Sequence, residues 1–326
     1  MNKLINYLLI FTLTVFLTVS VRAEEWKPDN TVKIVNPWGT SGTANFLCVS
    51  IQPVLQKTLG QTVICDQRPS AAGLIGTRQV AKQTKGDGLT LLSITPSNTS
   101  TNFVFLENTG YDTLNDFRVV AMIGTVPKTL VARADLPAND IKSFIESLKK
   151  YPGKMKQGIV IYTSDHLYSS YFKYKTKADY VSVSYKNGKE EMLPDVISGR
   201  IDFIWENMPT LKPYIKAGKL KPLAVSSMER LPDFPNVPTW GELGFDPIAL
   251  PSWYGYAVPK NTPDHIVNAL NKAFVEALND PALKKKLESR NVIVKVSSPA
   301  ESDKILKKTF EGMKEIGSLA NIQKKK

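Results

Sequence analysis

The chain has 326 residues, of which 42% are hydrophobic and 22% are charged. That composition is typical of a globular protein, and with a mean hydropathy of −0.17 it excludes a disordered chain and a multi-span membrane protein. Lysine and arginine outnumber aspartate and glutamate by 42 to 30, and the net charge of +12 suits an anionic ligand, nucleic acid, an anionic surface or simple solubility. Only two histidines and two cysteines are present, so we expect no metal site and no cofactor.

Residues 1–23 have the pattern of a secretory signal peptide. Lys3 supplies a positive charge before a nearly continuous apolar run, and Val21 and Ala23 fit the −3 and −1 positions of a cleavage site. A membrane-anchor helix is the alternative, but the run is shorter than the roughly 20 residues that span a bilayer. We therefore expect cleavage near Ala23 and a mature protein in the periplasm.

Export gives the two cysteines a second interpretation. Cys48 falls in a predicted helix and Cys65 ends the next predicted strand, so the two elements can pack together. An oxidising compartment permits a disulfide between them, and two buried thiols are the alternative. The sequence leaves both open.

Strand-like and helix-like segments alternate along the mature chain. In the first unit we expect strands at 32–36, 62–65 and 90–94 and helices at 46–59 and 71–82. In a second unit, which begins near residue 126, we expect strands at 129–132, 158–162, 180–184, 202–205 and 222–226 and helices at 141–150, 166–174, 192–198 and 211–217. After an ordered Pro-rich crossover at 231–238, we expect strands at 253–258 and 292–296 and helices at 264–278, 281–288 and 302–316. This order predicts mainly parallel sheets flanked by helices.

Ligands of open α/β sheets bind beyond the carboxyl ends of strands, where loops meet helix N-termini. The loop at 37–45 is the first candidate, because Gly39 and Gly42 let the backbone approach a ligand. Its hydroxyl groups and the N–H groups of the next helix can hold a carboxylate or phosphate: Thr40, Ser41 and Thr43. Its glycine spacing matches neither a Walker loop nor a dinucleotide fingerprint, and a plain turn is the alternative.

Three further loops have the same polar character, at 94–98, 162–166 and 205–209. Each also has the composition of an ordinary helix cap, because Ser, Thr, Asp and Asn are common there. Sequence alone therefore predicts four candidate loops without choosing among them.

Nothing in these loops predicts catalysis. Ser164, Asp165 and His166 are consecutive and cannot form a triad among themselves, because the members of a triad converge from separate parts of a chain. The sequence holds neither a G-x-S-x-G elbow nor an H-E-x-x-H helix. We expect a protein that is not an enzyme, with an exported hydrolase as the unsupported alternative. Glu190, Glu191 and the lysine clusters near the C-terminus are interpreted as solvated faces, and nucleic acid is not an expected partner.

A series of short motifs runs through the mature chain in order. The most specific is Arg68-Pro69-x-Ala71-x-Gly73-x-x-Gly76. Others are Asp87-Gly88-x-Thr90-Leu91-Leu92, Tyr185-Lys186, Ser198-Gly199-Arg200-Ile201-Asp202 and Ser252-Trp253-Tyr254-Gly255. With them the chain, over roughly residues 31–318, resembles the solute receptors of the tripartite tricarboxylate transporter family, also called the Bug family.

The resemblance implies an α/β fold of the two-domain periplasmic binding protein type (type II-like, a Venus flytrap), each domain a mainly parallel sheet flanked by helices. It places domain 1 at residues 24–125 and 230–326 and domain 2 at residues 126–229. It implies a monomer that captures a small organic acid (a di- or tricarboxylate, an aromatic acid or an acidic amino acid) and delivers it to membrane transporter subunits. A ligand-sensing partner of a membrane sensor kinase is the alternative.

Carried over residue by residue, the resemblance implies a ligand site in the four loops. The implied ligand contacts are Trp38, Gly39, Thr40, Ser41, Gly42, Thr43, Asn45, Thr95, Pro96, Ser97, Thr163, Ser164, His166, Glu206 and Asn207. The first loop departs from the family pattern, which has Pro-Gly-Gly followed three residues on by Asp, because Asn45 replaces that Asp here. Asp165 stands where Ser or Gly is common, and the stretch after Tyr185-Lys186 is one residue longer than usual. These departures leave the identity of the ligand open.

Overall fold

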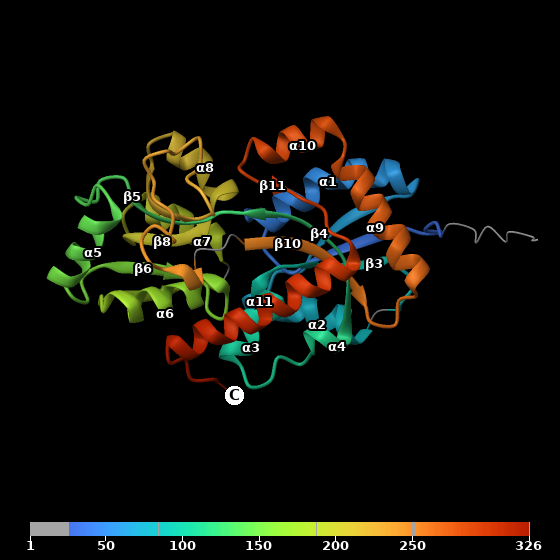
Figure 1. Cartoon of the computed structure of the whole chain (residues 1–326), viewed down its shortest axis with the longest axis horizontal. Coiled ribbons are helices and arrows are strands. Elements are labelled where there is room, and N and C mark those ends of the chain that lie inside the picture. The colour runs from blue at the N-terminus through green and yellow to red at the C-terminus, as the bar shows by residue number, and fades with distance from the viewer. Residues whose placement is uncertain (1–25, 84, 187, 249–251, 326) are drawn as a thin grey trace, which may run out of the picture.

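The computed structural model describes residues 26–83, 85–186, 188–248 and 252–325, which form two lobes side by side (Figure 1). The predicted signal peptide at 1–23 lies outside the described residues. No helix within the described ranges has both the length and the apolar character needed to cross a membrane. Each lobe is built on its own sheet, with helices packed against it.

The sheet of the first lobe has the strand order β11-β4-β10-β3-β1-β2. Its strands are β1 (Val32–Asn36), β2 (Val63–Gln67), β3 (Thr90–Ile94), β4 (Phe117–Val126), β10 (Ser252–Pro259) and β11 (Ile293–Val294). β1 runs parallel to β2 and β3, whereas β10 runs antiparallel to β3 and β4. The inner strands are almost wholly buried because helices cover both faces, as expected for continuous apolar runs.

The sheet of the second lobe has the strand order β7-β6-β8-β5-β9. Its strands are β5 (Lys128–Arg133), β6 (Lys156–Ile159), β7 (Val181–Ser184), β8 (Phe203–Asn207) and β9 (Leu220–Ser226). β6 is parallel to β7 and β8, and β5 is antiparallel to β8 and β9. In both sheets most strands point the same way: β10 and β11 point the other way in the first sheet, and β5 does so in the second.

Helices follow the strands in the alternating order that the sequence predicted. They are α1 (Thr43–Leu59), α2 (Leu74–Gln83), α3 (Asn102–Phe105), α4 (Thr113–Asp116), α5 (Ile141–Lys150), α6 (Ser164–Thr176), α7 (Lys189–Ile197), α8 (Met208–Lys216), α9 (Asp264–Leu278), α10 (Pro281–Glu288) and α11 (Pro299–Leu319). α1 ends where Gly60 takes the left-handed conformation (φ 66°), which a residue without a side chain adopts at little cost. The long helix α11 runs beneath both lobes, and its Met313 and Ile316 join the core of the second lobe (Figure 1).

Several elements differ from the sequence prediction. The ten-residue strand β4 was not predicted, because short helical turns and not a full helix separate it from β3. The predicted helix at 71–82 is broken at Ala72, which has a positive φ of 53°. The predicted strand at 292–296 shrinks to the two residues of β11.

The chain leaves the first sheet at Val126 and enters the second at Lys128. On the return path, Trp240 stacks on Trp205 of β8 with ring centroids 4.8 Å apart, and its backbone N–H donates to Val225 of β9. The predicted domain boundary at residue 229/230 remains a prediction. Because Trp240 still packs on the second lobe, these contacts favour a boundary closer to residue 252, where β10 begins.

A disulfide joins Cys48 of α1 to Cys65 of β2, with Cα atoms 6.2 Å apart. Of the two interpretations that the sequence left open, the structure has the disulfide. It ties the helix that follows the first candidate loop to the neighbouring strand.

Candidate functional site

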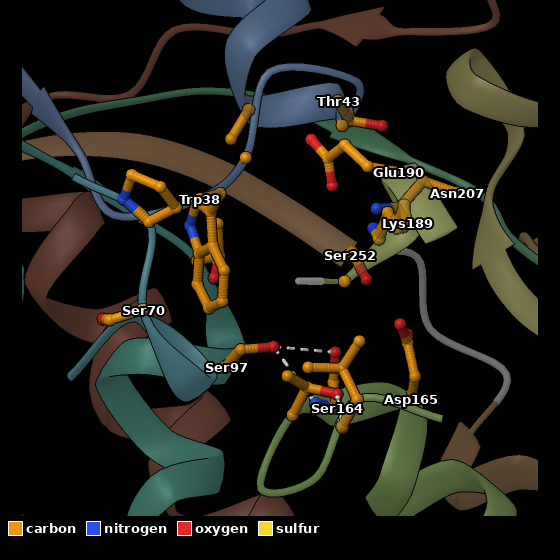
Figure 2. A pocket seen from close by; sticks show the side chains of 18 of the residues that line it. Trp38, Thr43, Ser70, Ser97, Ser164, Asp165, Lys189, Glu190, Asn207 and Ser252 are labelled. Carbon is orange, nitrogen blue, oxygen red and sulfur yellow. Dashed lines mark hydrogen bonds between the residues drawn. The ribbon is translucent and has the colours of Figure 1, made fainter. Parts of the chain in front are cut away.

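A cavity of about 680 Å³ lies between the lobes, where the carboxyl ends of β1, β3, β6 and β8 meet (Figure 2). All four candidate loops contribute to its wall. The sequence-predicted residues that line it are Trp38, Gly39, Thr40, Gly42, Thr43, Thr95, Pro96, Ser97, Thr163, Ser164 and Asn207. Ser41, Asn45, His166 and Glu206 are not part of that lining.

The first loop is held in shape by side chains behind it. Asn45 donates through Nδ2 to the carbonyl of Thr40 at 2.7 Å and accepts from Gln67 Nε2 at 2.6 Å. Asn45 therefore shapes the loop rather than touching the cavity. Gly42 caps α1 without any side-chain cap bond, so no cap side chain occupies the N–H groups of the first helical turn.

Ser97 and Ser164 meet at the seam between the lobes (Figure 2). Ser97 follows β3 in the first lobe, and Ser164 is the first residue of α6 in the second. Their Oγ atoms lie 3.1 Å apart, and the Ser164 N–H donates to Ser97 Oγ at 3.0 Å. Both residues are buried. The seam thus presents hydroxyl groups from both lobes at the positive end of a helix dipole.

Other hydrogen bonds also cross the cleft, so the lobes are closed on each other. Thr43 Oγ1 of the first lobe lies 3.0 Å from Thr210 Oγ1 of the second. Asn207 Nδ2 donates to the hydroxyl of Tyr254, on β10, at 2.7 Å. Burial raises the pKa of Tyr254, which keeps this hydroxyl neutral.

Two ion pairs lie on the second-lobe side of the cavity, each with a buried carboxylate. Lys128 pairs with Asp165, and Lys189 pairs with Glu206, whose side chain is fully buried. Burial disfavours the charge of Lys189, but the adjacent Glu206 carboxylate outweighs that effect and raises the pKa of Lys189. Because each ammonium already has a carboxylate partner, the two lysines add N–H donors to the wall without adding net charge.

Two of the expected ligand contacts, Glu206 and His166, lie outside the cavity lining. Glu206 was expected to contact the ligand, but its carboxylate lies behind the wall, where it accepts from the Asn207 N–H at 2.6 Å and holds Lys189. The His166 ring packs outside the cavity, stacked on Phe105 with centroids 4.3 Å apart. Burial and the nearby Lys325 lower the pKa of His166 to about 4.

Sequence reasoning missed several residues that line the cavity: Lys128, Asp165, Lys189, Glu190, Ser252 and Tyr254. The departures from the family pattern at Asp165 and in the stretch after Lys186 were the available signals. Glu190, interpreted as part of a solvated face, is exposed, and its carboxylate also accepts a hydrogen bond from the backbone N–H of Ser41 at 3.0 Å. Burial raises the pKa of Glu190, but hydrogen bonds from Ser41 outweigh it, and the pKa falls below its usual range.

Three polar atoms of the cavity wall are buried without a hydrogen-bond partner among the described residues. They are Trp38 Nε1, Asn207 Oδ1 and Ser252 Oγ. Figure 2 shows the Trp38 ring standing along one side of the cavity, opposite Ser252 and Lys189. Since a buried polar group without a partner costs free energy, these atoms are suited to bonding with a polar solute.

The comparisons with known proteins agree with this geometry. The model of the tripartite tricarboxylate transporter family receptor matches residues 48–321. Protein BugT of Bordetella pertussis is 28% identical over 304 residues, covering 93% of this chain and 92% of that protein. The structure of periplasmic binding protein BugD is similar with a TM-score of 0.85 and 27% identity, covering 91% of this chain and 100% of that one. R. palustris Rpa4515 with adipate is similar with a TM-score of 0.86 and 29% identity, covering 91% and 99%. The predicted fold class is confirmed.

Proposed function

Because the chain belongs to the tripartite tricarboxylate transporter receptor family, we propose that it captures a small organic carboxylate between its lobes and delivers it to membrane subunits of such a transporter. The similar structure of Rpa4515 with adipate supports a carboxylate as the class of ligand. The family assignment supports a receptor rather than an enzyme, and the described residues of the cavity wall offer hydroxyl, amide and ammonium hydrogen-bond donors for a ligand.

The observation that carries the proposal is the seam of Ser97 and Ser164. A carboxylate placed there accepts bonds from hydroxyl groups of both lobes and lies at the N-terminus of α6. A ligand that touches both lobes only in the closed form shifts the population toward closure. Closure is then the signal that a membrane partner recognises.

The remaining wall residues define the shape of the cavity around that carboxylate. We propose direct contacts from Trp38, Gly39, Thr40, Gly42, Thr43, Thr95, Pro96, Thr163 and Asn207. Lys128 and Lys189 donate further hydrogen bonds to the ligand. Three of the expected residues instead contact wall residues from outside the cavity. Ser41 donates a hydrogen bond to Glu190, Asn45 donates one to Thr40, and Glu206 forms an ion pair with Lys189.

The N-terminal sequence supports a periplasmic location. We propose that residues 1–23 are removed on export and that the mature chain acts as a monomer, with a small organic acid and transporter subunits as its partners and no nucleic acid. The disulfide between Cys48 and Cys65 is consistent with an oxidising compartment.

A thermal-shift screen tests the proposed function. The mature chain, from Glu24 onward, is refolded to remove ligand from the host and mixed with di- and tricarboxylates, aromatic acids, monocarboxylates and acidic amino acids. A ligand at a hundredfold excess over its Kd stabilises the folded state by about 2.7 kcal/mol, so a true ligand raises the midpoint clearly. A panel without any shift would overturn the carboxylate assignment. Neutral sugars of similar size are the control.

A further inference from the structure

Glu190 reaches across the cleft from the second lobe to the first. It lies in the first turn of α7, and its Oε1 accepts from the N–H of Ser41, a residue 149 positions away in sequence. An acidic residue in a first helical turn is favourable by itself, but this carboxylate extends to the opposite lobe. It therefore contributes to the cavity rather than to its own helix alone (Figure 2).

The Glu190 carboxylate lies directly on the backbone of the first loop. A Cβ atom added to Gly39 would lie 2.2 Å from Oε1 and 2.8 Å from Oε2 of Glu190. Only a residue without a side chain leaves room for this contact. The carboxylate thus occupies a position from which a ligand carboxylate would accept the same Ser41 N–H.

Glu190 is exposed, and the charge of the neighbouring Lys189 acts on its carboxylate without forming an ion pair with it among the described residues. Asp165 is paired with Lys128 and Glu206 with Lys189, but Glu190 has no cation within 4.0 Å among the described residues. The first loop itself, residues 37–45, contains no charged side chain. Glu190 therefore places one negative charge against the uncharged first loop, in a cavity whose lining also holds Lys186 and Lys189, whereas the seam of Ser97 and Ser164 consists of uncharged donors.

We propose that Glu190 is a specificity-determining residue, which excludes a second ligand carboxylate from the first-loop end and selects acids that carry an uncharged group there. The inference rests on the proposed function and narrows its substrate class to monocarboxylates with a polar, uncharged distal end. Two features act in the same direction: the Ser41 donor is already used, and a second anion beside Glu190 meets like-charge repulsion at short range. Adipate, bound by the similar Rpa4515, carries two carboxylates, so this chain is expected to differ in selectivity.

Matched ligand pairs test this inference. Linear diacids of four to seven carbons are each compared with their own monoamides, which have the same length and shape but one charge fewer. Calorimetry gives the ratio of the two Kd values for the wild-type chain and for Glu190→Gln. We expect the wild type to prefer the monoamide at least tenfold in the pair that binds best, and Glu190→Gln to reduce that preference at least fivefold.

Two further variants test whether the ratio of Kd values responds to the loss of any charge on α7 or to the loss of the bond to Ser41. Glu191→Gln removes a charge from the next residue of the same helix and is expected to leave the ratio unchanged. Glu190→Ala also removes the bond to Ser41, and the ratio is expected to fall as in Glu190→Gln. If Glu190 served only to hold the lobes closed, both members of a pair would weaken equally and the ratio would not move, which overturns the inference while the proposed function stands. Failure of every acid and amide to bind would overturn both.

Discussion

Ser97 of the first lobe and Ser164 of the second meet between the lobes with their Oγ atoms 3.1 Å apart. Ser97 follows β3, whereas Ser164 is the first residue of α6. The two residues are 67 positions apart in the sequence. Their contact brings two of the candidate loops into a single site.

The first prediction concerns this contact. Ser97→Ala removes an acceptor for the Ser164 N–H and a donor to the proposed carboxylate. We expect binding of the best carboxylate to weaken by about 1–3 kcal/mol, because the acceptor is charged. Calorimetry on the folded variant measures the change. Ser50→Ala is the matched control, since Ser50 is buried on α1 away from the cavity and its hydroxyl has no partner among the described residues. Equal affinities for wild type and Ser97→Ala would remove the seam from the site.

The second prediction concerns Gly39. Gly39→Ala places a methyl group where the Glu190 carboxylate lies, and this flexible side chain is expected to move away. The variant should therefore lower the monoamide preference in the same direction as Glu190→Gln, with little loss of stability. The Kd ratio of the matched pair measures it. A Gly39→Ala protein with the wild-type ratio would show that the position of Glu190 does not determine selectivity.

The third prediction concerns the buried pair of Lys189 and Glu206. Lys189→Met leaves the fully buried Glu206 carboxylate without its cation, which is expected to lower the free energy of unfolding by about 3 kcal/mol. Adding Glu206→Gln should recover much of that loss, because the buried group is then neutral. Urea unfolding of the single and double variants measures both steps. A double variant as unstable as Lys189→Met would contradict this explanation.

The fourth prediction concerns pH. The pKa of His166 is about 4 in the folded protein against 6.5 as its ordinary value, so the unfolded chain binds the proton more readily. The free energy of unfolding is therefore highest above pH 6.5. It decreases by at most about 3 kcal/mol as the pH falls toward 4, because protonation then favours the unfolded chain. His166→Phe, which keeps the stack on Phe105, should show a smaller loss of unfolding free energy over this range. Identical pH profiles would show that His166 is not the group responsible.

The fifth prediction concerns the disulfide. A thiol titration of the denatured, unreduced mature protein should find no free thiol, because Cys48 and Cys65 are joined. The free energy of unfolding of the double variant Cys48→Ala with Cys65→Ala should be about 3 kcal/mol lower than that of the wild type. This is the value expected for a disulfide whose cysteines are 17 positions apart. Two titratable thiols would contradict the bond.

Most of the fold was predictable because apolar runs such as β1 and β3 are separated by segments with helical spacing, the first of which ends at Gly60. Strand β4 was missed because no full helix precedes it and it passes through Pro127 directly into β5. Thr95, Ser97 and Ser164 were found in the sequence because polar loops at strand ends mark ligand sites in this class of fold. Lys128 and Glu190 were missed because their partners, Asp165 and Ser41, are 37 and 149 residues away, and no local pattern reports such a contact.

The most direct test of the whole account is a crystal structure of the mature chain with the carboxylate that gives the largest thermal shift. We predict closed lobes with the ligand carboxylate about 3 Å from Ser97 Oγ and Ser164 Oγ, and with Glu190 still bonded to Ser41. A ligand carboxylate bonded to the Ser41 N–H, with Glu190 displaced and the serine seam untouched, would contradict both the proposed site and the role given to Glu190.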